Sequence, residues 1–215
     1  LILAAKDSSG LIPFSESLQL DSTKISIAEF DALDFGTHAG FYEKLNTKPN
    51  VVVVCFGYLG NQTESQSDFK EIKKTIDANF TGAVSILEII ASDMEQKKAG
   101  SIIGISSVAG ERGRMSNYFY GAAKAGFTTY LSGLRQRLNK SKVNVLTVKP
   151  GFVYTKMTEG MNLPPLLTAQ PESVAQQVYK SYQSGRSVVY TKPVWRIIML
   201  VIKTIPEFIF KRLNF

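Results

Sequence analysis

Short runs of apolar residues alternate along this chain with longer segments in which apolar residues recur every three or four positions. We predict β-strands for the short runs, because their length and β-branched residues are typical of strands. Four consecutive valines, Val51–Val54, are typical of a strand that is buried on both faces of a parallel sheet. The predicted strands are residues 1–5, 25–30, 51–55, 101–105, 143–148 and 187–190.

The longer segments predict helices with one apolar face. Residues 72–94 and 123–138 have the most regular spacing, and residues 34–45 form a third candidate. Residues 171–184 begin with a proline and are followed by Gly185, as helices often begin and end. Alternating strands and helices predict an α/β fold with a doubly wound, Rossmann-like parallel sheet and right-handed crossovers.

Composition limits the classes of site that this chain can hold. It has 215 residues, of which 44% are hydrophobic and 20% charged, so we expect one globular domain rather than a disordered chain. The single cysteine, Cys55, and the single histidine, His38, exclude an intrachain disulfide and a structural zinc site. We predict no metal site, a surface position for His38, and a buried, unreactive position for Cys55 in its strand.

The positive charge of the chain is concentrated near its end. The net charge is +7, and residues 192–215 contain five basic residues and one acidic residue, which gives +4 there. We therefore divide the chain into a domain of residues 1–191 and a basic, apolar tail of residues 192–215. Nucleic-acid binding is not expected, because the excess positive charge lies mainly in an apolar segment and no recognition motif is present.

Candidate chemistry begins with Tyr120 and Lys124, which share one face of a predicted helix. A free phenol has a pKa of about 10. A nearby ammonium favours the phenolate, so Lys124 is expected to lower the pKa of Tyr120 toward neutrality and make it a proton donor or acceptor. A Tyr and Lys at this spacing also occur on ordinary helix surfaces. Ser106 and Ser107 follow a predicted strand, where they fit either a turn or a site that binds a substrate oxygen.

Together these residues resemble the short-chain dehydrogenase/reductase family. Tyr120-Gly-Ala-Ala-Lys124 matches the family's Tyr-x-x-x-Lys pair, with Ser107 13 residues and Asn79 41 residues before the tyrosine. The resemblance implies a catalytic tetrad of Asn79, Ser107, Tyr120 and Lys124. Ser106 and Tyr118 are alternatives that this spacing disfavours. The implied reaction interconverts a carbonyl and a secondary alcohol with a nicotinamide cofactor.

The resemblance also implies the residues that contact the cofactor, and it extends over residues 1 to about 190. Ala5-Lys6, after the first predicted strand, implies a preference for NADP over NAD, because a cation here can pair with the 2′-phosphate. Tyr120 and Lys124 are expected to contact the nicotinamide ribose. The other implied cofactor residues are Asp31, Gly57, Pro150, Gly151, Val153 and Thr155.

This sequence departs from the family pattern in two places. The Asn-Asn-Ala-Gly motif reads Val54-Cys-Phe-Gly57, so only its glycine is retained. The first strand and Gly-rich turn of the family, which hold the cofactor pyrophosphate, have no counterpart, and Leu1–Ala5 resembles the second strand. We therefore expect the sequence to be incomplete at its N-terminus.

A closer resemblance is to the decaprenylphosphoryl keto-pentose reductase branch, in the Pro150–Val153 loop, the segment 156–165 and the tail around Trp195. It implies a lipid-linked or small-molecule carbonyl substrate and a cytoplasmic enzyme at the inner face of the membrane, with residues 195–215 touching the bilayer. In the alternative interpretation, the tail packs on the cleft or on a partner subunit. The family also implies a homodimer or homotetramer. The rival function is a non-catalytic membrane- or protein-binding module that retained the fold.

Overall fold

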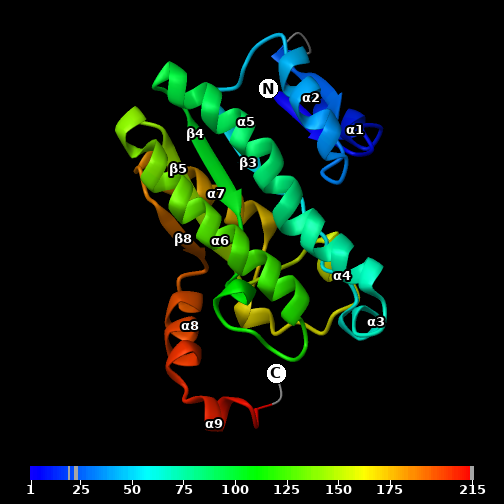
Figure 1. Ribbon diagram of the computed structural model, residues 1–215, viewed down its shortest axis with the longest axis vertical. Coiled ribbons are helices and arrows are strands. Elements are labelled where there is room, and N and C mark those ends of the chain that lie inside the picture. Colours follow the sequence, from blue (N-terminus) through cyan, green and yellow to red (C-terminus); the bar gives the residue numbers. More distant parts are fainter. Residues whose placement is uncertain (19, 22–23, 214–215) are drawn as a thin grey trace.

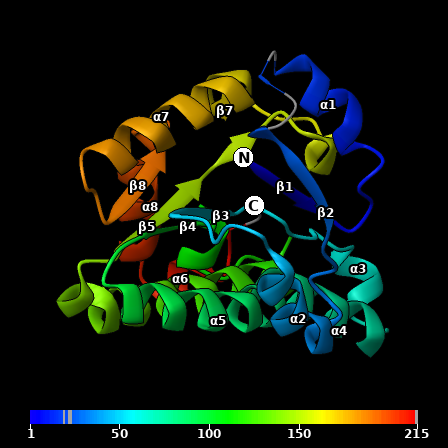
Figure 2. The same cartoon turned by 90° about the horizontal axis from the view of Figure 1, so that it is seen from above.

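The structure is a computed structural model that describes residues 1–18, 20, 21 and 24–213. It has the α/β architecture predicted from the sequence, with parallel strands between two layers of helices (Figures 1 and 2). Figure 2 shows α7 (Pro171–Gln183) on one side of the main sheet and α5 (Gly82–Lys97) and α6 (Tyr118–Leu138) on the other. The doubly wound fold class is confirmed.

The strands form two principal parallel sheets instead of one continuous sheet. The main sheet has the order β3-β4-β5-β8, and β1 pairs only with β2. Each predicted strand is confirmed to within two residues. The bounds are β1 Ile2–Ala5, β2 Ser26–Glu29, β3 Val51–Val54, β4 Ser101–Ile105, β5 Asn144–Pro150 and β8 Val188–Thr191, and a further short pair joins β6 Phe152–Val153 to β7 Thr168–Ala169.

The prediction that the four valines are buried on both faces is wrong. Val51 and Val53 are 38% and 51% exposed, whereas Val54 is buried. The strand β3 is an edge strand of the main sheet, and the face with Val51 and Val53 opens into a cavity. An edge strand beside a cavity lacks the cover that a central strand receives on both faces.

The regular apolar spacing of residues 72–94 corresponds to two helices joined through a π-helical turn. These are α4 (Phe69–Ile76), the turn η3 (Asp77–Thr81) and α5, which continue in one direction. The apolar faces of α5 and α6 form the main core with β3 and β4, including Leu87, Met94 and Phe127. A π-turn inserts a residue into the helix, and such turns are frequent at functional sites. Here the turn contains Asn79.

The surface position predicted for His38 is wrong. His38 begins α2 (His38–Lys44) and is fully buried, with Nδ1 2.9 Å from Ser85 Oγ and Nε2 3.0 Å from the Asp31 carbonyl oxygen. The helix α2 packs against α5, so a position that looked polar in sequence lies at a helix–helix contact. Both ring nitrogens have partners there, as burial of an imidazole requires.

The remaining helices complete the two layers. Gly185, with φ of +63°, follows α7 in the left-handed conformation that glycine adopts at helix ends, as the sequence predicted. The helices not yet bounded are α1 Leu11–Ser17, α3 Gln62–Ser65, α8 Val194–Thr204 and α9 Glu207–Phe210, with 3-10 turns η2 Phe35–Thr37, η4 Val108–Glu111, η5 Asn139–Ser141, η6 Lys156–Thr158 and η7 Pro165–Leu167. Sequence periodicity did not reveal α1 or α3, which are too short to show a period.

The tail forms two helices, one on either side of Pro206, and its inner face packs on the domain. Trp195 and Met199 are buried against Val108. Arg112 donates to the Ile202 and Ile205 carbonyl oxygens at 2.5 and 2.7 Å. These contacts tie α8 to the turn that follows β4. Residues 214 and 215 of the predicted tail lie outside the described residues.

A buried carboxylate strengthens this attachment. Glu111 pairs with Lys149 at 2.7 Å and with Lys203 of α8 at 2.9 Å, and Tyr190 also donates to it. Burial alone would raise the pKa of Glu111, but the hydrogen bonds from Lys149, Tyr190 and Lys203 lower it. Along the described residues, none of the helices combines the length and apolar character needed to cross a membrane.

Candidate active site

A cavity of about 910 Å³ lies at the carboxyl ends of β3, β4 and β5 and extends along the open face of β3, where Val51 and Val53 line it. Its walls come from the segments that follow these strands, from α7 on the opposite side, and from Trp195 of the tail. Most of the lining is apolar. Parallel α/β sheets place ligands at this end because the strand-to-helix loops converge there.

Ser106 and Ser107 follow β4 but make different contacts. Ser106 is buried and donates to the Lys124 carbonyl oxygen at 3.0 Å, with its oxygen also 2.6 Å from Thr128 Oγ1. It therefore fastens β4 to α6. Ser107 lines the cavity, and its Oγ accepts from the Ala109 amide at 3.1 Å. This bond leaves the hydroxyl proton of Ser107 available to a second partner.

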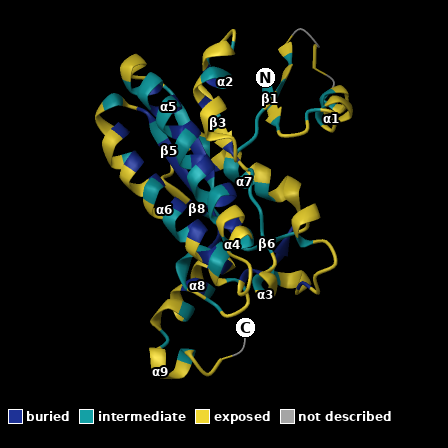
Figure 3. Cartoon of the chain, turned by 45° about the vertical axis from the view of Figure 1, so that its right-hand side comes forward, coloured by how far each residue is buried: buried dark blue, intermediate teal, exposed yellow. Residues whose placement is uncertain are grey.

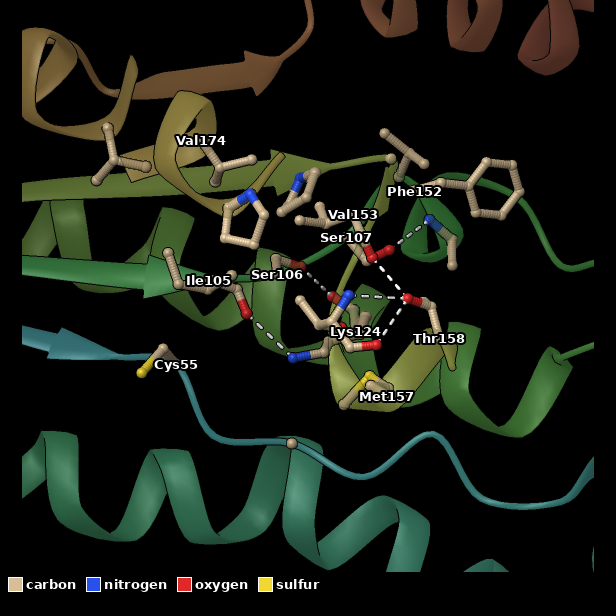
Figure 4. Close-up of a pocket in the computed structure, with 18 of the residues that line it drawn as sticks. Cys55, Ile105, Ser106, Ser107, Lys124, Phe152, Val153, Met157, Thr158 and Val174 are labelled. Carbon is tan, nitrogen blue, oxygen red and sulfur yellow. Dashed lines mark hydrogen bonds between the residues drawn. The ribbon is translucent and has the colours of Figure 1, made fainter. Parts of the chain in front are cut away.

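Tyr120 and Lys124 lie one turn apart on α6, and both line the cavity. The Lys124 ammonium donates to the Ile105 carbonyl oxygen at 3.0 Å (Figure 4). It is 5.7 Å from the centre of the Tyr120 ring. The ammonium is therefore directed toward the end of β4. Tyr120 and Lys124 therefore lie close together on α6, as their spacing in the sequence predicts.

The predicted lowering of the Tyr120 pKa is wrong for this structure. Burial raises the pKa of Tyr120 to about 12, although a hydrogen bond with Ser107 opposes the change. Burial also lowers the pKa of Lys124 to about 8. The two effects have one cause, since an apolar wall disfavours both a phenolate and an ammonium. Spacing along a helix does not report this desolvation.

Asn79 does not line the cavity with the other three residues of the expected tetrad. Its side chain is buried behind the segment that follows β3, where Nδ2 donates to the carbonyl oxygens of Tyr58 and Thr75 at 2.5 and 2.8 Å. Its Oδ1 accepts from the Tyr58 amide at 3.2 Å. A Cβ on Gly57 would approach Asn79 Oδ1 to 2.7 Å, so Gly57 is needed for this close contact. In this structure Asn79 is a positioning residue.

The segment after β5 brings four predicted cofactor residues to the cavity: Pro150, Gly151, Val153 and Thr155. A Cβ on Gly151 would meet the Trp195 indole at 1.9 Å, so this glycine is required by the tail as well as by any ligand. Thr158 donates to the Val153 carbonyl oxygen at 2.7 Å and accepts from the Thr155 amide at 3.1 Å. These bonds fix the loop that borders the cavity (Figure 4).

Cys55 is exposed, so the predicted burial in its strand is wrong. It follows β3 and projects into the cavity, because the face of β3 is open there (Figure 4). Its surroundings nevertheless raise the pKa of the thiol through desolvation, with Lys124 opposing the rise. A raised pKa leaves little thiolate at neutral pH, which agrees with the unreactive role expected for it.

The other predicted cofactor residues, Ala5, Lys6 and Asp31, lie at the β1–β2 sheet and do not line the cavity. The Lys6 ammonium pairs with the Asp31 carboxylate at 2.8 Å, and this hydrogen bond lowers the pKa of Asp31. The family resemblance implied separate cofactor contacts for Lys6 and Asp31. The structure makes them partners, because the ends of β1 and β2 are neighbours.

Several residues that line the cavity were not identified in the sequence. Arg114 and Asn117 come from the loop between η4 and α6, and Met157 and Met161 come from the loop after Thr155. Nothing in their spacing distinguishes them from surface loop residues. In the described part of the chain, no group of three acidic, cysteine or histidine side chains is placed to hold a metal ion.

Comparison with known proteins agrees with this arrangement. Residues 2–164 match the family described as short chain dehydrogenase. An uncharacterized oxidoreductase from Mycobacterium tuberculosis is 32% identical over 217 aligned residues, covering 99% of this chain and 87% of that protein.

Solved structures share the fold at low sequence identity. A short chain dehydrogenase from Burkholderia cenocepacia, in complex with NADP, has a TM-score of 0.78 at 16% identity and covers 98% of this chain and 96% of that chain. A short-chain dehydrogenase from Sphingobium yanoikuyae, in complex with NADPH, has a TM-score of 0.77 at 18% identity, covering 96% and 87%.

Proposed function

The chain belongs to the short chain dehydrogenase family and is an NAD(P)-dependent oxidoreductase, and from this premise we propose that it reduces a carbonyl group to a secondary alcohol beside Ser107 and Tyr120. The observation that carries the proposal is that Ser107, Tyr120 and Lys124 border one apolar cavity together with the Pro150–Val153 segment. Bound NAD(P)H supplies the hydride.

The cavity fits a nicotinamide cofactor in size and chemistry. Its volume of about 910 Å³ is large enough for a cofactor ring and a substrate. Among the described residues that line it are the ammonium of Lys124 and no acidic side chain. Lys124 and Tyr120 would hold the ribose hydroxyls. Val153 would offer backbone groups to the nicotinamide, and the Thr155 hydroxyl would contact phosphate. No acidic residue lines the cavity to repel that phosphate.

The hydroxyl groups of Ser107 and Tyr120 have different roles at the carbonyl oxygen. Ser107 donates a hydrogen bond to this oxygen as it gains negative charge, since its own oxygen already accepts from Ala109. Tyr120 donates the proton. A pKa of about 12 keeps the phenol protonated at neutral pH, which suits reduction more than oxidation. The test is the carbonyl-dependent loss of NADPH absorbance with the full chain and a small soluble ketone, and no loss above background would contradict the proposal.

We propose NADP as the preferred cofactor, with Lys6 as the partner of the 2′-phosphate. The ion pair with Asp31 holds the Lys6 ammonium at the end of β1, beside Ala5, which is small enough to leave room for a phosphate. The complexes of the two similar structures with NADP and NADPH support this choice.

Reversal of the charge at Lys6 tests the preference. Lys6→Glu is expected to weaken NADPH binding by at least about tenfold and to change NADH binding little, because it replaces an attraction to phosphate by a repulsion. Binding is measured for both cofactors by quenching of protein fluorescence. Lys24→Glu, which also adds a carboxylate near the β1–β2 sheet, is the control. An unchanged NADPH-to-NADH ratio would show that Lys6 only pairs with Asp31.

We further propose that the substrate is a keto-sugar on a polyprenyl phosphate carrier and that the enzyme is cytoplasmic, at the inner face of the membrane. The support is the outer face of the tail, where Ile197, Leu200, Val201, Phe208 and Ile209 are exposed (Figure 3). Lys211 and Arg212 are exposed beside them, whereas Lys203 is paired with Glu111. An exposed apolar face with adjacent cations fits an anionic lipid surface.

Charged residues on this outer face are expected to prevent membrane binding without unfolding the protein. The double variant Leu200→Asp/Phe208→Asp changes two exposed side chains and leaves buried Trp195 and Met199 intact. We expect the wild type to sediment with anionic liposomes and the variant to remain in the supernatant. Phe69→Asp, at an exposed position on α4, is the control. Wild-type protein that stays in the supernatant at low salt would contradict membrane association.

We retain a homodimer or homotetramer as a proposal from the family resemblance. The outward positions of α5 and α6 include the ion pairs of Arg137 with Glu88 and Glu95, both at 2.7 Å. An interface through these helices would therefore be partly polar.

A further inference from the structure

Arg114 lines the same cavity as Ser107 and Tyr120. Its side chain is half-buried, and its Nε is fully buried without a hydrogen-bond partner. Burial lowers the pKa of Arg114. Within residues 1–18, 20, 21 and 24–213, no carboxylate forms an ion pair with it. A desolvated guanidinium without an acceptor is energetically costly, so an anionic ligand that accepts its hydrogen bonds would be bound favourably.

The other half-buried arginines of the described chain show what is missing at Arg114. Arg112 donates to two carbonyl oxygens of the tail and pairs with Glu207 at 2.9 Å. Arg135 donates to the Val145 carbonyl oxygen at 2.8 Å and to Thr147 Oγ1 at 2.7 Å. Both arginines therefore donate hydrogen bonds to acceptors within the protein. Arg114 differs from them because it lines the cavity and its Nε has no hydrogen-bond partner among the described residues.

The surroundings of Arg114 favour a negative group. The charged side chains that line the cavity are Arg114, Lys124 and Lys156, and no acidic side chain is among its lining residues. The long helix α6 begins at Tyr118, four residues after Arg114, and a helix N-terminus adds partial positive charge. With few polar groups in the wall, these charges are weakly screened.

A second, smaller cavity of about 110 Å³ adjoins this region and shares Asn117 and Tyr120 with the first. Gln62 lines it, and its Nε2 is a buried donor without a partner. Phe119 of α6 donates to the Oε1 of the same amide at 3.4 Å. Gln62 Nε2 and Arg114 Nε are both buried donors without a hydrogen-bond partner, and the cavities that these two residues line share Asn117 and Tyr120. Two such donors in one region are consistent with a bound oxyanion.

We propose that Arg114 binds an oxyanion of the substrate, a carboxylate or a phosphate ester, whose attached apolar body lies along Met157 and Met161. This inference rests on the proposed function and narrows it to carbonyl substrates that combine an anionic group with an apolar portion. A planar guanidinium can donate two parallel hydrogen bonds to either group. Tyr120 lines both cavities, so an anion held by Arg114 places the rest of the ligand beside the Tyr120 hydroxyl.

The anion is assigned to the substrate rather than to the cofactor because of where Arg114 lies along the chain. It is in the loop between Ser107 and Tyr120, the two groups that face the reacting carbonyl oxygen in the proposed function. The residues proposed to hold the cofactor, Pro150 to Thr155, come from β5 and the loop after it. Arg114 and the residues proposed to hold the cofactor therefore come from different segments of the chain.

The test uses three probes with one apolar body: geraniol, geranate and geranyl phosphate. Their affinities for the full chain are measured by isothermal titration calorimetry, without turnover. We expect the wild type to bind at least one of the two anions at least about tenfold more tightly than geraniol, the usual size of a charge-assisted hydrogen bond in affinity. The preferred anion distinguishes a carboxylate from a phosphate ester.

Variants assign the preference to Arg114. Arg114→Gln should remove it and leave geraniol binding unchanged, Arg114→Lys should retain part of it, and Arg186→Gln, at an exposed position outside the cavity, should retain all of it. A wild type without anion preference, or an Arg114→Gln variant that keeps it, would overturn the proposal. A loss of NADPH affinity in Arg114→Gln, with anion preference intact, would reassign the residue to the cofactor. Since binding needs no hydride transfer, a protein that binds anions but reduces no ketone would instead contradict the proposed function.

Discussion

Tyr120→Phe is expected to lower the rate of ketone reduction by at least about 10²-fold, the usual contribution of a general acid. Phenylalanine keeps the ring that lines the cavity and removes only the hydroxyl, so NADPH affinity and the melting temperature should change little. The measurement is carbonyl-dependent NADPH oxidation with the full chain, together with NADPH binding by fluorescence.

Tyr118→Phe is the matched control, since Tyr118 lies two residues earlier on α6 and does not line the cavity. It should keep full activity. If Tyr120→Phe retains more than half of the wild-type rate, the proton comes from another group.

The raised pKa of Tyr120 also predicts how the rates of reduction and oxidation depend on pH. The phenol stays protonated up to about pH 12, so its proton-donating role should not decline between pH 6 and 9. Alcohol oxidation needs the phenolate and should therefore become faster as the pH rises.

Lys124→Met is expected to abolish activity while making the protein more stable at pH 7. Burial lowers the pKa of Lys124 from 10.5 to about 8, so at pH 7 the folded protein holds an ammonium that its surroundings disfavour. Removing that charge should raise the free energy of unfolding by roughly 1–2 kcal/mol, after allowance for the lost bond to the Ile105 carbonyl oxygen. Thermal unfolding at pH 7 measures the gain.

The pH dependence separates this cause from others. Between about pH 8 and 10.5 the unfolded chain binds more protons at this lysine than the folded protein does, so the stability of the wild type should rise with pH in that interval. Lys124→Met should lack this rise. Lys140→Met, at an exposed position after α6, should retain it. Equal pH profiles for the wild type and Lys124→Met would show that Lys124 is not the group responsible.

The effects expected for Tyr120→Phe and Lys124→Met have one cause, the apolar lining of the cavity. In the proposed function, the apolar lining of the cavity strengthens the hydrogen bonds at the carbonyl oxygen and disfavours the charge of Lys124, the residue proposed to hold the cofactor. A buried ionisable group that the active site requires, such as Lys124, commonly lowers the free energy of unfolding.

Local sequence patterns determined most of the fold. Strand positions followed from short apolar runs, and the apolar spacing of α5 and α6 followed from the helical period, because both depend on near neighbours. The spacing from Ser107 to Tyr120 and Lys124 identified three residues that now border one cavity. That success depended on resemblance to a family as well as on chemistry, since Tyr and Lys at this spacing are not unusual alone.

The sequence by itself determined the order of strands and helices, the alternation that makes the sheet parallel, and the proximity of Tyr120 to Lys124 within one helix. Only the tertiary structure decided that His38 is buried, that Asn79 holds Tyr58 from behind the cavity, and that the Arg114 Nε has no hydrogen-bond partner among the described residues. It also reversed the expected direction of the Tyr120 pKa. The physical reason is common to these cases: burial and pairing depend on contacts between distant segments, and desolvation acts through the three-dimensional surroundings of a group, which the spacing of residues along a chain does not contain.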